Sequence, residues 1–469
     1  MTLLAEVPYI ADSASLLNAV RDLPRPVFLD CGQPADCAGR FDIVAADPFA
    51  TLITRGKNTT LSSLTDAHSS ARDPLEILDE VLATHAAEGD SVHDRSPLEG
   101  TDIPFSGGAI GYFSYDLGRR YERYAGTAVD DIGLPELVVG IYDWAVVVDH
   151  KLHRSWLVGG GRDPRTQDNW DDLISRVSGT ALAEDAVDFR VLTEVGSNLS
   201  EDAYGASFRA IKDHIRAGNS YQVNLTQRFS ARVTGDSWQA YQALRNTNPA
   251  PFSAFLDFPE GQVLSSSPER FLRVVDGRVE TKPIKGTRRR AEDPEADRAL
   301  ADELRTSSKD RAENVMIVDL LRNDLGKVCL AGSVRADHLF EIETFASVHH
   351  LVSTVTGILA PGQSSLDLLR ACFPGGSITG APKLASMQII DEVEPHWRGI
   401  YCGAIGYIGF DGSMDTNVAI RTLLRRGDSI HAWAGGGIVA DSEPDSEFQE
   451  SLDKAAAMLS ILKPGAMSS

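Results

Sequence analysis

Two stretches of the chain carry carboxylates at helical spacing. In SSKDRAENVMIVDLLRNDLG, Asp310 and Glu313 lie one turn apart on a helix that Ser307 can cap. In the second stretch, DSEPDSEFQESLDKAAAMLSIL, one helix face carries Glu447, Glu450 and Lys454. A plain amphipathic helix explains either pattern by itself. Carboxylates that converge from two helices, with positions open for water and substrate oxygens, would instead suit magnesium.

A lysine stands in an unusual setting in KPIKGTRRR. Lys285 lies between an isoleucine and a glycine at the end of a strand-like run. It is a surface residue, a phosphate clamp together with the arginines at 288–290, or a nucleophile. We interpret the three arginines as a solvated surface run, because the net charge of -22 does not favour a nucleic-acid patch.

The segment around this lysine predicts a β-hairpin. Two strand-like runs flank the Asp-Gly pair at 276–277, so residues 270–275 should pair with residues 278–284. This register puts Glu269 at the same end of the hairpin as Lys285. Ideal alternation would place the two side chains on opposite faces, so a shared face requires a bulge or a twisted end. The proline and the glycine of PIKG are suited to that distortion.

Three further features could bind an anion or move a proton. The glycines of AGGGIVADS follow a strand and form either a nest of backbone N–H groups or a tight turn. Arg421 interrupts an apolar run, which indicates a structural ion pair or a carboxylate clamp. His350 precedes another apolar run and is a satisfied core residue or a proton donor.

Composition limits the classes of protein to consider. The chain has 469 residues, of which 42% are hydrophobic and 24% charged, as in ordinary globular proteins. Its negative charge argues against nonspecific binding to nucleic acid or to anionic membranes. We find neither a leader pattern nor an apolar run of about 20 residues, so a cytoplasmic protein is expected. The scattered cysteines at 31, 37, 329, 372 and 402 are expected to be reduced thiols.

The order of the elements indicates two regions. Residues 1–190 mix short strands with polar segments, and a more regular region follows at 195–463. The second region opens with a helix that Ser200 can cap and that Gly218 ends, followed by the alternating strand YQVNLTQRF.

Several motifs together resemble those of the chorismate-utilising enzymes. These motifs are SPERF, KPIKGT, DRAENVMIVDLLRNDLG, HHLVSTV, FPGGSITGAPK, YCGAIGY and GGGIVADSEPDSEFQESLDKA, and they occur in the family's order over about residues 197–462. The family includes anthranilate synthase component I, aminodeoxychorismate synthase component I, isochorismate synthase and salicylate synthase. RFDIVAADP and GGAIGYFSYDLGRRYE resemble the N-terminal region of the first two members. The resemblance implies the α+β fold of anthranilate synthase, with two large antiparallel sheets packed together, flanking helices and two intertwined lobes.

Lys285 distinguishes the reactions of this family. Anthranilate synthases carry alanine there, in PIAGT, whereas aminodeoxychorismate synthases carry lysine, in PIKGT as here. The resemblance therefore implies that Lys285 attacks C2 of chorismate as the 4-hydroxyl leaves. Ammonia then adds at C4 and expels the lysine. Glu269 of SPERF is implied as the general acid. The expected product is 4-amino-4-deoxychorismate, on the route to 4-aminobenzoate and folate.

The resemblance also implies the binding residues. Glu313 and Glu450 match the principal Mg²⁺ ligands, and Asp310 and Glu447 match supporting acidic positions. The metal would hold the ring carboxylate of chorismate. Groups that bind the other carboxylate are matched by Tyr401, Arg421 and the amides of Gly436 and Gly437. Further active-site positions are matched by His350, Ser377 and Lys454.

Partners and alternatives follow from the same comparison. The chain shows no glutamine amidotransferase segment, so use of glutamine would require a separate amidotransferase subunit in a heterodimer, whereas free ammonia could serve alone. Isochorismate or salicylate synthesis, with Lys285 as the general base for water, is the enzymatic alternative. The second alternative is a non-catalytic subunit of an amidotransferase complex. Some members bind tryptophan beside a serine where this chain has Cys31, so tryptophan binding is not implied.

Overall fold

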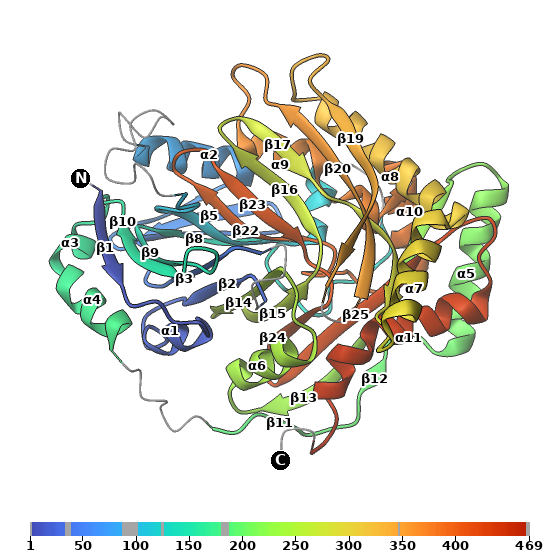
Figure 1. Cartoon of the computed structure of the whole chain (residues 1–469), viewed down its shortest axis with the longest axis horizontal. Coiled ribbons are helices and arrows are strands. Elements are labelled where there is room, and N and C mark those ends of the chain that lie inside the picture. The colour runs from blue at the N-terminus through green and yellow to red at the C-terminus, as the bar shows by residue number, and fades with distance from the viewer. Residues whose placement is uncertain are drawn as a thin grey trace.

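The strands form two large sheets with helices around them (Figure 1). The computed structural model describes the following parts of the 469-residue chain: 2–32, 39–86, 102–122, 126–179, 187–345 and 348–465. Every pairing between the strands of these parts is antiparallel. The predicted α+β class with two large antiparallel sheets is confirmed.

The first sheet contains 13 strands within the described residues. Its main path runs β1-β10-β9-β3-β2-β14-β15-β24-β25-β13-β11, and β12 and β21 also pair with β13. The bounds of its strands are β1 Leu3–Val7, β2 Val27–Asp30, β3 Phe41–Ala45, β9 Trp144–Asp149, β10 Arg154–Gly159, β11 Arg190–Val191, β12 Gly196–Ser197, β13 Gln222–Thr234, β14 Phe252–Phe258, β15 Gly261–Ser267, β21 Gly380–Ala381, β24 Thr422–Arg426 and β25 Ser429–Ile438.

The second sheet contains 12 strands within the same residues. Its path runs β18-β20-β17-β16-β23-β22-β7-β8-β4-β5-β6, and β19 pairs with β20. The bounds of its strands are β4 Ala50–Arg55, β5 Asn58–Ser63, β6 Ala67–Ser70, β7 Gly108–Phe113, β8 Leu137–Tyr142, β16 Arg270–Val275, β17 Arg278–Thr281, β18 Ile284–Arg289, β19 Arg335–Thr344, β20 Val348–Ile358, β22 Ala404–Gly409 and β23 Met414–Val418.

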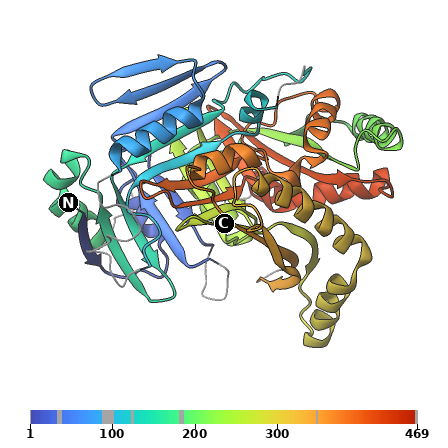
Figure 2. The same cartoon turned by 90° about the horizontal axis from the view of Figure 1, so that it is seen from above.

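Helices flank the sheets, and α7 and α8 form an outlying corner of the molecule in Figure 2. The helices are α1 Ala14–Asn18, α2 Pro74–His85, α3 Pro164–Asp168, α4 Trp170–Ser178, α5 Glu201–Arg216, α6 Ser237–Thr247, α7 Pro294–Thr306, α8 Ser308–Gly326, α9 Ser365–Cys372, α10 Lys383–Val393 and α11 Pro444–Ile461, with short 3₁₀ turns at η1 Tyr115–Arg120 and η2 Gly376–Ile378. No helix within the described residues is long and apolar enough to cross a membrane.

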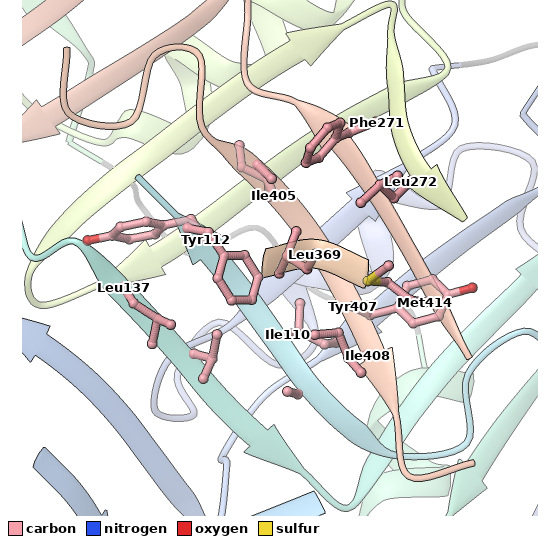
Figure 3. Packing of buried hydrophobic residues seen from close by; sticks show 14 of the residues in the cluster. Ile110, Tyr112, Leu137, Phe271, Leu272, Leu369, Ile405, Tyr407, Ile408 and Met414 are labelled. Atoms are coloured by element: carbon pink, nitrogen blue, oxygen red, sulfur yellow. The ribbon is translucent and has the colours of Figure 1, made fainter. Parts of the chain in front are cut away.

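The two sequence regions share both sheets. In the first sheet β2 pairs with β14, and in the second β7 pairs with β22, so each sheet joins strands from before and after residue 190. The main hydrophobic core lies between the sheets and takes residues from both. Figure 3 shows one part of this cluster, with Ile110 of β7, Ile405 of β22 and Leu369 of α9 among its members. Neither sheet can therefore be completed without both regions.

Strand β9 explains a feature of the sequence. Its alternate residues enter different cores: Ala145 and Val147 pack between the sheets, whereas Val146 and Val148 pack on the opposite face of the first sheet. A strand that is buried on both faces needs an unbroken apolar run rather than alternation. This accounts for the run WAVVV.

The two acidic helices begin where their sequence signals predict. The Ser307 hydroxyl accepts the Asp310 backbone N–H at 3.3 Å and caps α8. Pro444 stands in the first turn of α11, as the sequence indicates. In the last residues of β25, the glycine triplet is extended strand and not a tight turn. Cys329, Cys372 and Cys402 are buried free thiols, Cys31 is buried, and Cys37 lies outside the described residues.

Candidate active site

The hairpin that precedes Lys285 forms only in part. Strands β16 and β17 pair from Val275↔Arg278 to Arg273↔Glu280, as the Asp-Gly turn predicts. The predicted continuation to Ile284 is wrong, because β17 ends at Thr281 and the next strand, β18, pairs with β20 instead. Proline at 283 has no N–H to offer a ladder, so the strand is interrupted there.

Glu269 and Lys285 still come close together. The Ile284 N–H donates to the Glu269 carboxylate, which lies at the entrance to β16. The β18–β20 pairing contains a bulge between Ile284 and Thr287, and Gly286 within it has φ +85°. The required distortion is therefore present. The bulge turns the Lys285 side chain toward the Glu269 side, where an ideal strand would direct it away.

Ser377, in η2, contacts both groups. Its hydroxyl donates to Glu269 Oε1 at 2.8 Å, and its carbonyl oxygen accepts from Lys285 Nζ at 2.9 Å. Glu269 is buried and Lys285 is half-buried. One short segment thus holds a carboxyl group and an amine side by side.

Burial shifts both groups toward their neutral forms. It raises the pKa of Glu269, although Lys285 and the Ser377 hydroxyl act in the opposite direction. It also lowers the pKa of Lys285, although Glu269 and Glu313 oppose this. A neutral carboxyl can donate a proton and a neutral amine can attack carbon, which are the two forms that acid-assisted displacement needs.

Two helices bring carboxylates to the same side of this pair. Glu313 on α8 and Glu450 on α11 act electrostatically on each other and on Lys285. Glu447 is buried, and its Oε1 accepts from the Ser442 hydroxyl at 2.6 Å. A Cβ on Gly436 would lie 3.1 Å from Glu447 Oε2. The last strand of the first sheet therefore lies against the acidic helix, and glycine leaves the room for it.

Two of these three carboxylates have a raised pKa, and the third is paired with a lysine. Burial raises the pKa of Glu313 and of Glu447, and the neighbouring carboxylates add to the effect. Burial acts on Glu450 in the same sense, but Lys454, bonded to it at 2.7 Å, lowers its pKa overall. Buried carboxylate oxygens such as those of Glu313 and Glu447 suit a hard divalent cation.

Asp310, unlike Glu313 and Glu447, is paired with an arginine. Its carboxylate pairs with Arg288 at 3.2 Å, and a Cβ on Gly286 would lie 2.9 Å from its Cγ. Arg288 also pairs with Glu303, and Arg290 pairs with Asp297. Arg289 and Arg290 are exposed, as the interpretation of a solvated surface run predicts, whereas Arg288 is half-buried against acidic residues of α7 and α8.

Arg421 is bonded to an amide and not to a carboxylate of the described residues. It donates to Asn248 Oδ1 at 2.8 Å, and no carboxylate within the described parts of the chain lies within 4.0 Å of its guanidinium. Burial, together with the nearby Arg289, lowers its pKa. The sequence left two alternatives for Arg421, a structural ion pair and a carboxylate clamp. The ion pair is not found within the described residues. A guanidinium in this state is suited to receive an anionic ligand.

His350 and Tyr401 lie in the same interior. His350 Nδ1 is 2.8 Å from the Thr287 hydroxyl, and burial, assisted by Arg421, lowers its pKa to about 3. Tyr401 is buried and stacks on Trp433, with ring centroids 6.3 Å apart. Burial raises the pKa of Tyr401 well above its ordinary value. Both side chains are thus neutral hydrogen-bonding groups.

The backbone of β25 is open on one edge at the glycines. Gly436 and Gly437 pair with Leu225 and Asn224 of β13. On the other edge β24 pairs with β25 only as far as Ala432, so within the described residues no strand covers that edge beside the glycines. Lys454 Nζ donates to the carbonyl oxygen of the preceding glycine, Gly435, at 3.1 Å.

Sequence reasoning missed several residues of this interior. Asn248, which holds Arg421, gave no signal because it lies far away in the chain. Lys309 acts on both Glu313 and Glu450, and its i,i+4 spacing to Glu313 could have revealed it. Arg398 and its partner Glu394 form a buried ion pair that periodicity does not reveal.

Cys31 belongs to a different part of the molecule. It lines a cavity of about 560 Å³ between the sheets, together with residues such as Phe252 and Tyr407. None of the predicted site residues lines this cavity.

Comparisons with known proteins agree on one family. The family described as chorismate binding enzyme matches residues 28–460. Aminodeoxychorismate synthase component 1 of Escherichia coli (strain K12) is 46% identical over 441 residues, which cover 94% of each chain. Anthranilate synthase component 1 of Thermus thermophilus is 41% identical and covers 84% of this chain and 87% of its own. A crystal structure of anthranilate synthase component I from Streptococcus pneumoniae superposes with a TM-score of 0.78 at 32% identity, covering 92% of this chain and 94% of that one.

Proposed function

The chain belongs to the chorismate binding enzyme family, and on that basis we propose that it converts chorismate and ammonia into 4-amino-4-deoxychorismate and water. The observation that carries the proposal is the arrangement at Ser377, which hydrogen-bonds Glu269 through its hydroxyl and Lys285 through its carbonyl. The relatives with 45–46% identity over most of the chain bear the name of that synthase.

The proposed chemistry assigns one role to each group. Glu269 gives its proton to the 4-hydroxyl, which leaves as water while the neutral Lys285 amine attacks C2. Ammonia then adds at C4 and the bond between C2 and the lysine nitrogen breaks. A proton from the added ammonia returns to Glu269. Burial of both groups supports these roles, since it favours the acid in its protonated form and the amine in its neutral form.

Magnesium is the proposed cofactor. Glu313 and Glu450 would hold the ion, with Glu447 and Asp310 in support. The raised pKa values of Glu313 and Glu447 support this assignment, because they mark carboxylates that a cation would relieve. When bound, Mg²⁺ would neutralise and orient the ring carboxylate of chorismate.

The second carboxylate of chorismate is assigned to a cation and to neutral hydrogen-bond donors. Arg421 offers a guanidinium that no carboxylate of the described residues neutralises, and Tyr401 with the amide of Gly437, on the open edge of β25, offers neutral donors. The amide of Gly436, the other glycine of this assignment, faces Leu225 of β13 in the ladder. His350 would act as a neutral hydrogen-bonding group. Lys454, which is bonded to Glu450, completes the site on the acidic side.

A partner subunit is part of the proposal. The relatives are named component 1, which implies a second component in those proteins. We infer that a separate glutamine amidotransferase subunit supplies ammonia to this chain, and that the reaction takes place in the cytoplasm.

The test uses the purified chain with chorismate, Mg²⁺ and an ammonium salt. The expected product is 4-amino-4-deoxychorismate, detected as 4-aminobenzoate after coupling to a lyase. Isochorismate or salicylate as the main product would assign Lys285 as a general base for water, anthranilate would assign amination at C2, and no product would indicate a non-catalytic subunit. Each of these results overturns the proposal.

The role of Lys285 is tested separately. Lys285→Ala should abolish amination at C4 and can redirect amination to C2. The matched control is Lys282→Ala, which removes a nearby lysine that pairs with Glu343 at 2.9 Å. If Lys285→Ala keeps full C4 amination, the lysine is not the nucleophile.

A further inference from the structure

Arg398 is a buried arginine that contacts segments carrying residues of the proposed site. Arg398 follows α10 in the connection to β22, and its side chain is 2% exposed. Its guanidinium also lies over the Tyr115 ring, 4.9 Å from the centroid. Burying a guanidinium without partners costs several kcal/mol, so the number and placement of its contacts matter.

Every N–H of this guanidinium has an acceptor. Nε and one Nη2 hydrogen bind the two carboxylate oxygens of Glu394, at 2.9 and 2.6 Å. Nη1 donates to the carbonyl oxygen of Ile378 at 3.0 Å and lies 3.7 Å from the sulfur of Cys402. The second Nη2 hydrogen donates to the carbonyl oxygen of Asn224 at 3.1 Å. Five donors in a rigid plane thus join three separate segments.

Those segments carry the proposed site. Ile378 follows Ser377, which hydrogen-bonds both Glu269 and Lys285. Asn224 is the residue that pairs with Gly437 across the β13–β25 ladder.

Two further hydrogen bonds connect Arg398 and its partner Glu394 to the proposed site. Glu394 Oε1 also accepts the Thr226 backbone N–H at 2.9 Å, which ties the pair to β13 a second time. The Arg398 carbonyl accepts the Tyr401 backbone N–H at 3.1 Å.

We propose that Arg398 is a positioning residue, which fixes the Ser377 segment against β13 and thereby sets the distance between the reacting pair and the groups that hold the carboxylate. It touches neither substrate nor reacting atoms. Its effect passes through the carbonyls of Ile378 and Asn224. Misplacement of reacting groups by about 1 Å can cost a factor of about 100 in rate.

Lysine cannot replace this arginine. An ammonium group has three donors at one point, whereas Arg398 spreads five donors over a plane and reaches acceptors from η2, β13 and α10. Arg398→Lys therefore keeps the charge beside Glu394 but loses the link between the carbonyls.

The matched control is Arg245→Lys. Arg245 is also buried, with 7% exposure, and is paired with Asp30 at 2.6 Å, and its hydrogen bonds in the described structure go to residues outside the proposed site. We expect both variants to lower the thermal midpoint to a similar extent. Only Arg398→Lys should lower kcat, by about 100-fold. Ser377 bonds Glu269 and Lys285, the two groups that titrate in the reaction. If one of these hydrogen bonds is lost, the acidic or basic limb of the pH–kcat/KM profile of Arg398→Lys should move by about one pH unit.

A milder variant covers the case in which Arg398→Lys does not fold. Glu394→Gln keeps one oxygen, which can still accept both the Thr226 N–H and an Nη2 hydrogen of Arg398, but it puts an NH2 group where Oε2 accepts Nε. We expect this variant to fold with kcat reduced about tenfold. If Arg398→Lys folds and shows the kinetics and the pH profile of wild type, the proposal is overturned. If only Glu394→Gln folds, the same result in that variant overturns it. An equal loss of kcat in Arg245→Lys would overturn it too.

This inference rests on the proposed function, and the assay separates the two. Wild-type protein that forms no 4-amino-4-deoxychorismate removes the proposed function and the positioning role together. Wild-type product combined with unchanged kinetics in the variants removes the positioning role alone.

Discussion

His350 links burial to charge in a way that can be measured. Its side chain is 3% exposed and Nδ1 lies 2.8 Å from the Thr287 hydroxyl. Burial, assisted by the guanidinium of Arg421, lowers the pKa of His350 from its ordinary value of 6.5 to about 3. The imidazole in the folded protein is therefore neutral at pH 5, where the same side chain in the unfolded chain is protonated.

This difference makes stability depend on pH with a defined sign. Between pH 6.5 and about 3 the unfolded state binds a proton at His350 that the folded state does not, so the free energy of unfolding falls as the pH falls. Each pH unit below 6.5 costs about 1.4 kcal/mol until the folded pKa is reached. Between pH 7 and pH 5 the contribution of His350 is thus a loss of about 2 kcal/mol.

The assay compares urea unfolding of wild type and His350→Gln at pH 7 and pH 5. Glutamine does not titrate, so the variant should lose about 2 kcal/mol less than wild type over this interval. His338→Gln is the control for removing an exposed histidine, because the His338 side chain is 64% exposed. The same pH-dependent loss in wild type and His350→Gln, or a His350 ring signal that titrates near pH 6.5 in NMR, would refute the reasoning.

Three further predictions concern the charged groups of the site. Ser377→Ala removes a hydrogen bond to the ionised form of Glu269, so the pKa of that carboxyl should rise by about one to two units, measured by carboxyl NMR titration; an unchanged or lower pKa contradicts it. Glu450→Gln should weaken Mg²⁺ binding at least about tenfold in calorimetry, whereas Asp453→Asn on the same helix should not; equal affinities contradict the metal assignment. Arg421→Gln should raise KM for chorismate roughly 10- to 100-fold while leaving the urea midpoint unchanged or higher, because it removes a buried charge that no carboxylate of the described residues balances; an unchanged KM excludes the clamp.

The local features of the site were predictable from the sequence. The caps and starts of α8 and α11 depend on residues within one turn, and the i,i+3 spacing of Glu447 and Glu450 fixes a common face. The register at the start of the β16–β17 hairpin was predictable for the same reason, since its Asp-Gly turn is local.

The prediction of the hairpin was wrong where a strand distant in the sequence provides the pairing. Beyond Thr281 the chain leaves β16, and β18 pairs with β20, which lies more than 60 residues further along. No local signal specifies that partner. Proline at 283 marked the break, but the sequence did not show that the Glu269 carboxylate itself would accept the Ile284 N–H in place of a strand.

The buried pair of Arg398 and Glu394 was beyond sequence reasoning for a related reason. The two residues are four apart, but only Glu394 caps the end of α10, and the carbonyls of Ile378 and Asn224 come from segments that the fold brings together. An arginine in such a place satisfies backbone groups that leave regular structure. Its partners are fixed by tertiary contacts and not by spacing.

The distribution of charge in the site explains how an acidic chain could hold a dianion. Burial, together with neighbouring carboxylates, raises the pKa values of Glu313 and Glu447, whereas burial and the nearby Arg289 lower the pKa of Arg421. Burying either set of charges costs free energy in the protein alone. A substrate with two carboxylates, one bridged to the acidic residues by a divalent cation and one beside the arginine, would relieve both at once. The site would thus select for two separated negative charges, and Lys285, which responds to both Glu269 and Glu313, lies within reach of the acidic end.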